Sequence, residues 1–335
     1  MPNSTDFELM EAEAESLSDP LLCKVDMPLR ATYHPLGFSV EIATNSHEVL
    51  EAAEESWGRF RAATFSEPPL QVRVGVLEGE SSICPPVPVC RAQRNLLSMV
   101  ADRDNFAVCD LDQRFAFAWL TQAAVQQRSY LRYHFLDAVT LVLLATSYAT
   151  PLHAACVSYA EQGFLLCGDS GAGKTSLAYA CARAGWTYTS DDASYLVQAR
   201  EDRRVVGNAH QFRFRPLAVQ LFPELEGNSL TPRASGKPSI EIPTDRMPNI
   251  AIASQCSIDH IVFLNRRDPH PPGLNPYPKE VARQWFNQTL YSMPEVRKAQ
   301  TRAIDTLLSA EVWELRYSTF DYAIDQLESL ARRSK

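Results

Sequence analysis

The chain has 335 residues, of which 45% are hydrophobic and 21% are charged. This is a typical globular composition, and the length predicts one large domain or two ordinary ones. The formal net charge is −8 and the basic residues are scattered, so the sequence lacks the basic patch that a nucleic-acid backbone requires. We therefore expect no nucleic-acid partner.

The first part of the chain predicts a small α+β domain. Residues 1–25 open with a run of acidic residues that no Lys or Arg interrupts before residue 24, which predicts a disordered acidic tail. Alternating apolar residues predict strands at 38–44 and 70–77, and the helical spacing of 46–60 predicts a helix with Ser46 as its N-cap. The stretches LLSMVA, NFAVCDL and RFAFAWL then predict an antiparallel meander, which completes an N-terminal domain over 26–127.

The second part predicts an α/β domain over 128–335. A helical segment is expected from 127 to 149, and its apolar stretch 136–150 is too short for a membrane span, so no membrane partner is expected. Strands are predicted at 152–159 and 163–168, a helix at 176–185, and a strand that ends in Asp191-Asp192. Further strands are expected in ASYLVQA, around FRFRP, and in IEIP and HIVFLNRR, before closing helices at 279–309 and 319–333.

The cysteines predict a reducing compartment. The eight cysteines lack the spacing of a metal site, and several lie among apolar neighbours, as small core residues do. We therefore expect reduced thiols and a cytoplasmic protein. Cys84 and Cys90, at the ends of CPPVPVC, are the one pair considered for a disulfide, and the cytoplasmic assignment argues against it.

The stretch GDSGAGKT fits the phosphate-loop pattern GxxxxGK[ST] between a predicted strand and a predicted helix, which is the context that supports the motif. The glycines let backbone N–H groups turn toward phosphates, and the helix N-terminus adds partial positive charge. The Lys side chain is expected to bind phosphate oxygens of ATP and the Thr hydroxyl to bind Mg²⁺. The nucleotide-binding residues predicted are Gly168, Asp169, Ser170, Gly171, Ala172, Gly173, Lys174 and Thr175.

Two neighbouring acids follow the next predicted strand. If that strand lies beside the strand that leads into the loop, both strands end at the same sheet edge, and Asp191 and Asp192 return to the phosphates. One carboxylate is then placed to organise Mg²⁺, and the other to accept the proton of an attacking hydroxyl, as a kinase requires. An ordinary acidic turn is the alternative. His153 begins the strand expected to pair with the loop strand, and a structural role is the alternative for it too.

Residues 151–196 resemble the catalytic core of the bacterial HPr kinase/phosphorylase family. In that family a strand begins with His, a GDSGxGKS loop follows, a helix ends in Arg-x-Gly, and the next strand closes with Ala-Asp-Asp. The resemblance implies a P-loop kinase core of the type shared with ATP-dependent phosphoenolpyruvate carboxykinase. It also implies that Asp192 is the catalytic base, that Asp191 is its metal-linked partner, and that His153 lies beside the phosphates.

The resemblance has gaps. The segment VVGNAHQFRFRP (205–216) has no acid where the family carries a metal-binding Glu, and the loops used for the reverse phosphorolysis have no counterpart. Arg213 and Arg215, expected on one side of a strand, and Lys237 in a Gly-Lys loop are candidate phosphate contacts, with solvated surface positions as the alternative. The family forms rings, which leaves a homo-oligomer open.

The sequence therefore predicts an ATP-dependent kinase that transfers the γ-phosphoryl group to a hydroxyl, with serine as the first candidate, on a protein, peptide or small molecule. A carboxykinase-like phosphotransferase is one alternative, although its usual second metal would need His and Asp ligands that do not cluster here. A module that binds ATP as a sensor and transfers nothing is the other alternative.

Overall fold

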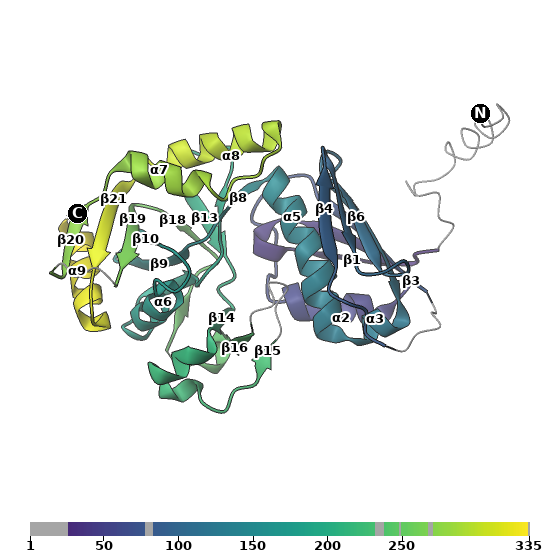
Figure 1. Cartoon of the computed structure of the whole chain (residues 1–335), viewed down its shortest axis with the longest axis horizontal. Coiled ribbons are helices and arrows are strands. Elements are labelled where there is room, and N and C mark those ends of the chain that lie inside the picture. Colours follow the sequence, from purple (N-terminus) through teal and green to yellow (C-terminus); the bar gives the residue numbers. More distant parts are fainter. Residues whose placement is uncertain (1–25, 78–82, 232–237, 248, 267–270, 334–335) are drawn as a thin grey trace.

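The computed structural model describes residues 26–77, 83–231, 238–247, 249–266 and 271–333. The predicted acidic tail and Lys237 lie outside these ranges. The described chain is mixed α/β and contains several mixed sheets. One large sheet with its helices makes up one side of the molecule, and the remaining sheets lie on the other side (Figure 1). We refer to residues 26–148 as the N-terminal lobe and to 149–333 as the core lobe.

The N-terminal lobe is built on one seven-stranded sheet. Its strands, in spatial order, are β1 (Leu29–Tyr33), β2 (Val40–Thr44), β3 (Leu70–Leu77), β7 (Phe115–Thr121), β6 (Phe106–Asp110), β5 (Leu96–Val100) and β4 (Val89–Gln93). Strands β2, β3 and β7 are parallel, and the other neighbours are antiparallel. The predicted antiparallel meander is confirmed as β5, β6 and β7, whereas β1 and β4 were not predicted.

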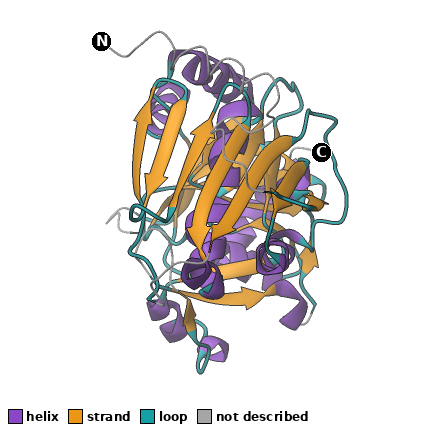
Figure 2. Ribbon diagram, turned by 90° about the vertical axis from the view of Figure 1, so that its right-hand side faces the viewer, coloured by secondary structure: helices purple, strands orange, loops and turns teal. Residues whose placement is uncertain are grey.

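Helical segments cover one face of this sheet, and Figure 2 views it from the other side, with the helices behind the strands. They are η1 (Pro35–Gly37), α2 (His47–Trp57), α3 (Gln122–Gln126), α4 (Arg128–Tyr130), the π-helical turn η2 (Leu131–Leu136) and α5 (Asp137–Ser147). Buried residues of α2, η2 and α5 share one hydrophobic core with the sheet. Ser46 precedes α2 as predicted, but its hydroxyl donates to Glu48 Oε2 at 2.5 Å and makes no cap hydrogen bond.

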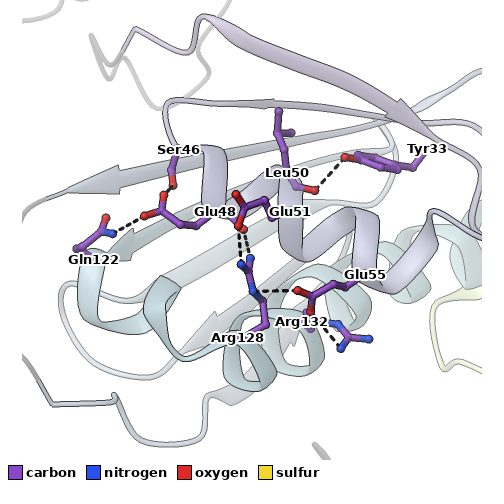
Figure 3. A network of polar contacts seen from close by, with 9 residues as sticks. All are labelled: Tyr33, Ser46, Glu48, Leu50, Glu51, Glu55, Gln122, Arg128 and Arg132. Atoms are coloured by element: carbon purple, nitrogen blue, oxygen red, sulfur yellow. Dashed lines mark hydrogen bonds and ion pairs between the residues drawn. The ribbon is translucent and has the colours of Figure 1, made fainter. Parts of the chain in front are cut away.

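A polar network fastens α2 to the helices that follow the sheet (Figure 3). Arg128 Nη2 lies 2.7 Å from Glu51 Oε2, and Arg128 Nε lies 3.3 Å from Glu55 Oε1. Arg132 Nη1 in turn lies 3.5 Å from Glu55 Oε2. Because Arg132 belongs to η2, this network sets the position of the π-helical turn against the C-terminal end of α2.

The core lobe is built on a second seven-stranded sheet. Its strands, in spatial order, are β17 (Ala251–Ile252), β11 (Thr187–Ser190), β9 (Ala155–Tyr159), β10 (Gln162–Cys167), β19 (His260–Asn265), β21 (Glu311–Arg316) and β20 (Gly273–Pro276). Helices α6 (Lys174–Arg183) and α9 (Phe320–Arg333) pack on one face, and α7 (Lys279–Asn287) and α8 (Pro294–Leu307) on the other. Our expectation that β11 is adjacent to β10 is wrong, because β9 lies between them. Since β9 is antiparallel to both, β10 and β11 still end at the same edge.

Two smaller sheets join the core lobe to the N-terminal lobe. One contains β18 (Gln255–Ser257), β13 (Arg204–Gly207), β12 (Ser194–Val197) and β8 (Ala149–Leu152), and the other contains β14 (Gln211–Phe214), β16 (Ser239–Pro243) and β15 (Leu230–Thr231). Short 3₁₀ turns are η3 (Pro216–Gln220), η4 (Pro223–Leu225) and η5 (Thr244–Arg246). The predicted helix to residue 149 ends at Ser147, because β8 begins at Ala149 and pairs with β12.

Two expectations from the sequence can be compared directly with this fold. Cys84 and Cys90 are exposed free thiols, so they form no disulfide. No helix within the described residues combines the length and the apolar character that crossing a membrane would need.

Candidate functional site

The glycine-rich loop joins β10 to α6, as the sequence predicts. Gly168, Gly171 and Gly173 adopt φ values of 144°, 89° and 100°, a region that residues with a side chain rarely occupy. A Cβ at Gly173 would lie 3.1 Å from Tyr317 Oη, so the close packing of the loop also disfavours a side chain there. Lys174 is the first residue of α6, and the backbone N–H groups of its first turn provide the usual anion-binding end of a helix.

Lys174 is held at the centre of the loop. Its side chain is buried, and Nζ donates hydrogen bonds to the carbonyl oxygens of Gly168 at 2.8 Å and Asp169 at 3.3 Å. Its third neighbour is His153 Nε2 at 2.9 Å. Burial lowers the pKa of the Lys174 ammonium, and the carboxylate of Asp192 opposes that shift. A phosphate oxygen at the loop would compete for these same hydrogens and would compensate the buried charge.

His153 links the lysine to Asp192. It follows β8 and precedes β9, so it lies at the same sheet edge as the loop. An ammonium group can only donate, so Nε2 of His153 accepts from Lys174 and the ring proton is on Nδ1. Nδ1 lies 3.5 Å from Asp192 Oδ1. Burial and the nearby Lys174 lower the pKa of His153, so the neutral ring connects Lys174 to Asp192.

Asp191 and Asp192 point to different surroundings. Asp191 is buried, and its Oδ2 accepts the backbone N–H of Arg213 at 2.6 Å. The Thr175 hydroxyl donates to the carbonyl oxygen of Asp191 at 3.2 Å, which turns the lone pairs of the hydroxyl away from that carbonyl. Asp192 is partly exposed beside His153. Within the described residues, no group of three or more His, Cys, Asp or Glu side chains could hold a metal ion.

The turn that carries the two acids is fixed by small residues that the sequence analysis did not select. Ser190 and Ser194 share a hydrogen bond of 2.6 Å across the turn, and Ser194 Oγ donates to the carbonyl oxygen of Ala154 at 2.9 Å. A Cβ at Gly207 would lie 2.5 Å from Ser190 Cβ, so only glycine lets β13 approach the turn this closely. These contacts hold the acids beside the start of β9.

Of the three candidate phosphate contacts, the two that the structure describes contact different groups. Arg213 is directed at Glu241 Oε1, 3.0 Å away, and lies over the ring of Tyr133. Arg215 instead reaches the loop, where its Nη2 lies 3.4 Å from Ser170 Oγ. The two side chains therefore contact different groups: Arg213 belongs to β14, whereas Arg215 follows the end of β14 at Phe214 and precedes the 3₁₀ turn η3. Lys237 lies outside the described residues.

Two residues that directly follow β19 and β21 also reach the loop, and the sequence did not identify them. Arg266 follows β19 directly, and its guanidinium lies over the ring of Tyr317, 5.5 Å from the centroid. The Tyr317 hydroxyl is buried with no hydrogen-bond partner among the described residues. Because β19 pairs in parallel with β10, its carboxyl end lies at the same edge as the loop. The sequence predicted a strand in HIVFLNRR, but it did not show that this strand pairs in parallel with the strand that leads into the loop.

A cavity of about 310 Å³ borders the loop on the side of β19 and α7. Its lining includes Gly168, Asp169 and Gly171 of the loop together with Tyr277, Trp285 and Arg266. Trp285 Nε1 points toward Asp169 Oδ1 at 3.4 Å. The cavity thus joins flat aromatic rings to the polar glycine loop, which suits a ligand with a planar part and a polar part.

No protein-family model and no curated protein matches the chain. Among solved structures, the chain is similar to the Hpr(Ser) kinase/phosphatase from Coxiella burnetii, with a TM-score of 0.31 and 14% sequence identity. That match covers 55% of this chain and 95% of the other. The chain thus has a distant structural resemblance to this enzyme, and its function has to be inferred from the chemistry of its own residues.

Proposed function

We propose that the protein is an ATP-dependent kinase that transfers the γ-phosphoryl group to a hydroxyl, with serine as the first candidate. The observation that carries this proposal is the continuous contact from Lys174 through His153 to Asp192 at the end of the glycine loop. A loop that only binds nucleotide needs the lysine. A loop that transfers a phosphoryl group also needs a proton acceptor close to it.

In this proposal ATP lies along the loop. The backbone N–H groups of the loop and of α6 bind the phosphates, together with Lys174. Arg215, beside Ser170, adds positive charge close to the γ-phosphate. The unpartnered Tyr317 hydroxyl offers a further donor, which fits an anion at this place. The base of the nucleotide lies in the cavity beside Trp285 and Tyr277.

The residues present fit Mg²⁺ as the partner of ATP. The Thr175 hydroxyl donates its hydrogen to the carbonyl oxygen of Asp191, so the hydroxyl oxygen remains able to bind a cation. This contact also places Thr175 next to the turn that carries Asp191 and Asp192. Bound Mg²⁺ would neutralise charge on the phosphate oxygens. The protein's own part is to align the acceptor hydroxyl with the γ-phosphorus, to keep Asp192 beside it through His153, and to receive the hydroxyl proton on Asp192.

The test is to incubate the protein with Mg²⁺ and γ-labelled ATP in an extract of the organism that makes it, and to identify the labelled acceptor by mass spectrometry. We expect a phosphomonoester on a hydroxyl, and no label with Lys174→Ala. ATP binding without any labelled acceptor would refute the kinase proposal.

A module that binds ATP without transfer is the second candidate, and one observation favours it. Asp191 Oδ2 is occupied by a backbone N–H at 2.6 Å, so this carboxylate is less available to a metal than the sequence suggests. The same experiment separates the two candidates, because a sensor binds ATP and leaves the γ-phosphate on it.

A further inference from the structure

A second cavity lies on the other side of Asp192, between the two lobes. Its volume is about 120 Å³. Its lining includes Asp191 and Asp192 of the core lobe, Trp57 at the end of α2, Phe60 shortly after α2, and Asp137 at the start of α5. None of these N-terminal residues belongs to the glycine-loop region, so the site proposed for phosphoryl transfer opens into a space that the N-terminal lobe helps to form.

The polar groups of this cavity are fixed in place before any ligand enters. Arg132 is held by Glu55 at 3.5 Å, a contact drawn in Figure 3, and by Ser56 Oγ at 3.0 Å. In the core lobe, Arg213 is held by Glu241 at 3.0 Å. Both arginines therefore have acidic partners. Arg132 also lies in the π-helical turn η2, a deformation that is common at functional sites.

Asp137 differs from the arginines. Within the described residues, Trp57 Nε1 is the one hydrogen-bond donor to its carboxyl group, at 3.0 Å. Burial raises the pKa of this carboxyl group, and the positive charges of Arg213 and Arg132 oppose the shift. A half-buried carboxyl group with a single donor has further acceptor capacity, which a donor on a ligand in the cavity can use.

We propose that this cavity binds the acceptor as a small molecule, whose reacting hydroxyl faces Asp192 and whose second polar group, a hydroxyl or an amine, donates to Asp137. This inference rests on the proposed kinase function and adds the class of its acceptor. Trp57 and Phe60 bound the cavity with flat apolar surface, and the few polar groups that converge on it set the orientation, as in other small-molecule sites.

The volume favours a small molecule over a protein. A single water needs roughly 10–15 Å³ of such space, so about 120 Å³ admits a compound of several non-hydrogen atoms. The cavity is bounded by both lobes, and Arg59 of the N-terminal lobe is tied to Asp245 of the core lobe at 3.0 Å. A folded protein would have to present its hydroxyl through this junction.

The transfer step balances without a further reactant. The acceptor oxygen forms a bond to the γ-phosphorus, and the bond from that phosphorus to the bridging oxygen of ATP breaks. The electron pair leaves with ADP, and the hydroxyl proton moves to Asp192. The product is a phosphomonoester of the small molecule.

The first experiment divides the extract by size. The protein is incubated with Mg²⁺ and γ-labelled ATP and with either the ultrafiltrate of the extract or the retained macromolecules. We expect label on a compound of the ultrafiltrate that carries a second hydroxyl or an amine. Label confined to macromolecules would overturn this inference and leave the kinase proposal standing. The absence of label from both fractions, with ATP still bound, would overturn the kinase proposal itself.

The second experiment changes the cavity. Asp137→Asn keeps an oxygen that can accept the hydrogen bond from Trp57, but it weakens the hydrogen bond to the compound that receives the phosphoryl group. Transfer at low ultrafiltrate concentration should therefore fall roughly 10- to 100-fold, the usual effect of losing a hydrogen bond to a charged group. Asp112→Asn makes the same chemical change at an exposed turn and should have no effect. Leu141→Phe should reduce transfer by narrowing the cavity. ATP affinity, measured by calorimetry, should stay unchanged in all three variants, and unchanged transfer in both cavity variants would refute the site.

Discussion

Asp192→Asn tests whether the carboxylate beside His153 is the base. The substitution keeps the size of the side chain and an oxygen that can accept from His153 Nδ1, 3.5 Å away. It removes only the ability to take up a proton. The usual contribution of a general base is about 10²–10⁴ in rate, equivalent to roughly 2.7–5.4 kcal/mol of activation free energy. We therefore expect phosphoryl transfer to fall by that factor.

The structure also predicts what Asp192→Asn leaves unchanged. The side chain is about one-third exposed, and interactions of exposed charges contribute little to stability, so the midpoint of thermal unfolding should hardly move. ATP affinity should stay level or rise, because a negative charge near the phosphates is removed. Asp191→Asn is the matched comparison, and it should raise the Mg²⁺ concentration required. The assays are label transfer and calorimetry with Mg-ATP, and a variant that transfers as fast as the parent would show that the base is elsewhere.

Three further predictions concern the loop. Lys174→Ala should lower ATP affinity, measured by calorimetry, roughly 10- to 100-fold, because charge-assisted hydrogen bonds to phosphate are lost. The pKa of His153 is lowered in the folded protein, so as the pH falls the unfolded chain takes up a proton on this histidine before the folded protein does. The free energy of unfolding therefore keeps its full value above about pH 6.5 and decreases as the pH falls below it. Between pH 8 and pH 5, the midpoint of thermal unfolding should decrease less in His153→Gln than in the parent. Gly173→Ala should destabilise more than Gly185→Ala in denaturant unfolding. Both positions have positive φ, but only the first would crowd Tyr317.

The sequence predicted the local structure around the glycine loop, between β10 and α6. The glycine pattern, flanked by a strand and a helix, located the loop, because its chemistry depends on consecutive residues. His153 and Asp192 lie 21 residues before and 18 residues after Lys174 in the sequence, and the structure brings both to it. Their approach depends on strand direction, and the direction was predicted correctly even though β9 separates β10 from β11.

The sequence could not show contacts that depend on which strands are neighbours. Arg266 and Tyr317 reach the loop because β19 and β21 continue the sheet in parallel, and parallel neighbours come from distant segments whose order has no local signal. The different contacts of Arg213 and Arg215 were also beyond the sequence pattern. The alternation of a strand applies only as far as Phe214, and the end of a short strand is the least certain part of any pattern.

The cavity between the lobes was beyond sequence reasoning for a different reason. In the sequence, Asp137 lies at the start of the apolar stretch 136–150, which predicts only a helical segment there. A carboxyl group at the first position of α5 also has an ordinary explanation, since acids stabilise helix N-termini. What makes it a candidate binding group is the hydrogen bond that it accepts from Trp57 and its place in the lining of the cavity that also includes Asp192. The cavity depends on how the lobes pack, so a residue whose sequence position indicates only a helix N-terminus becomes, once the lobes meet, a half-buried acceptor in the same cavity as the proposed base.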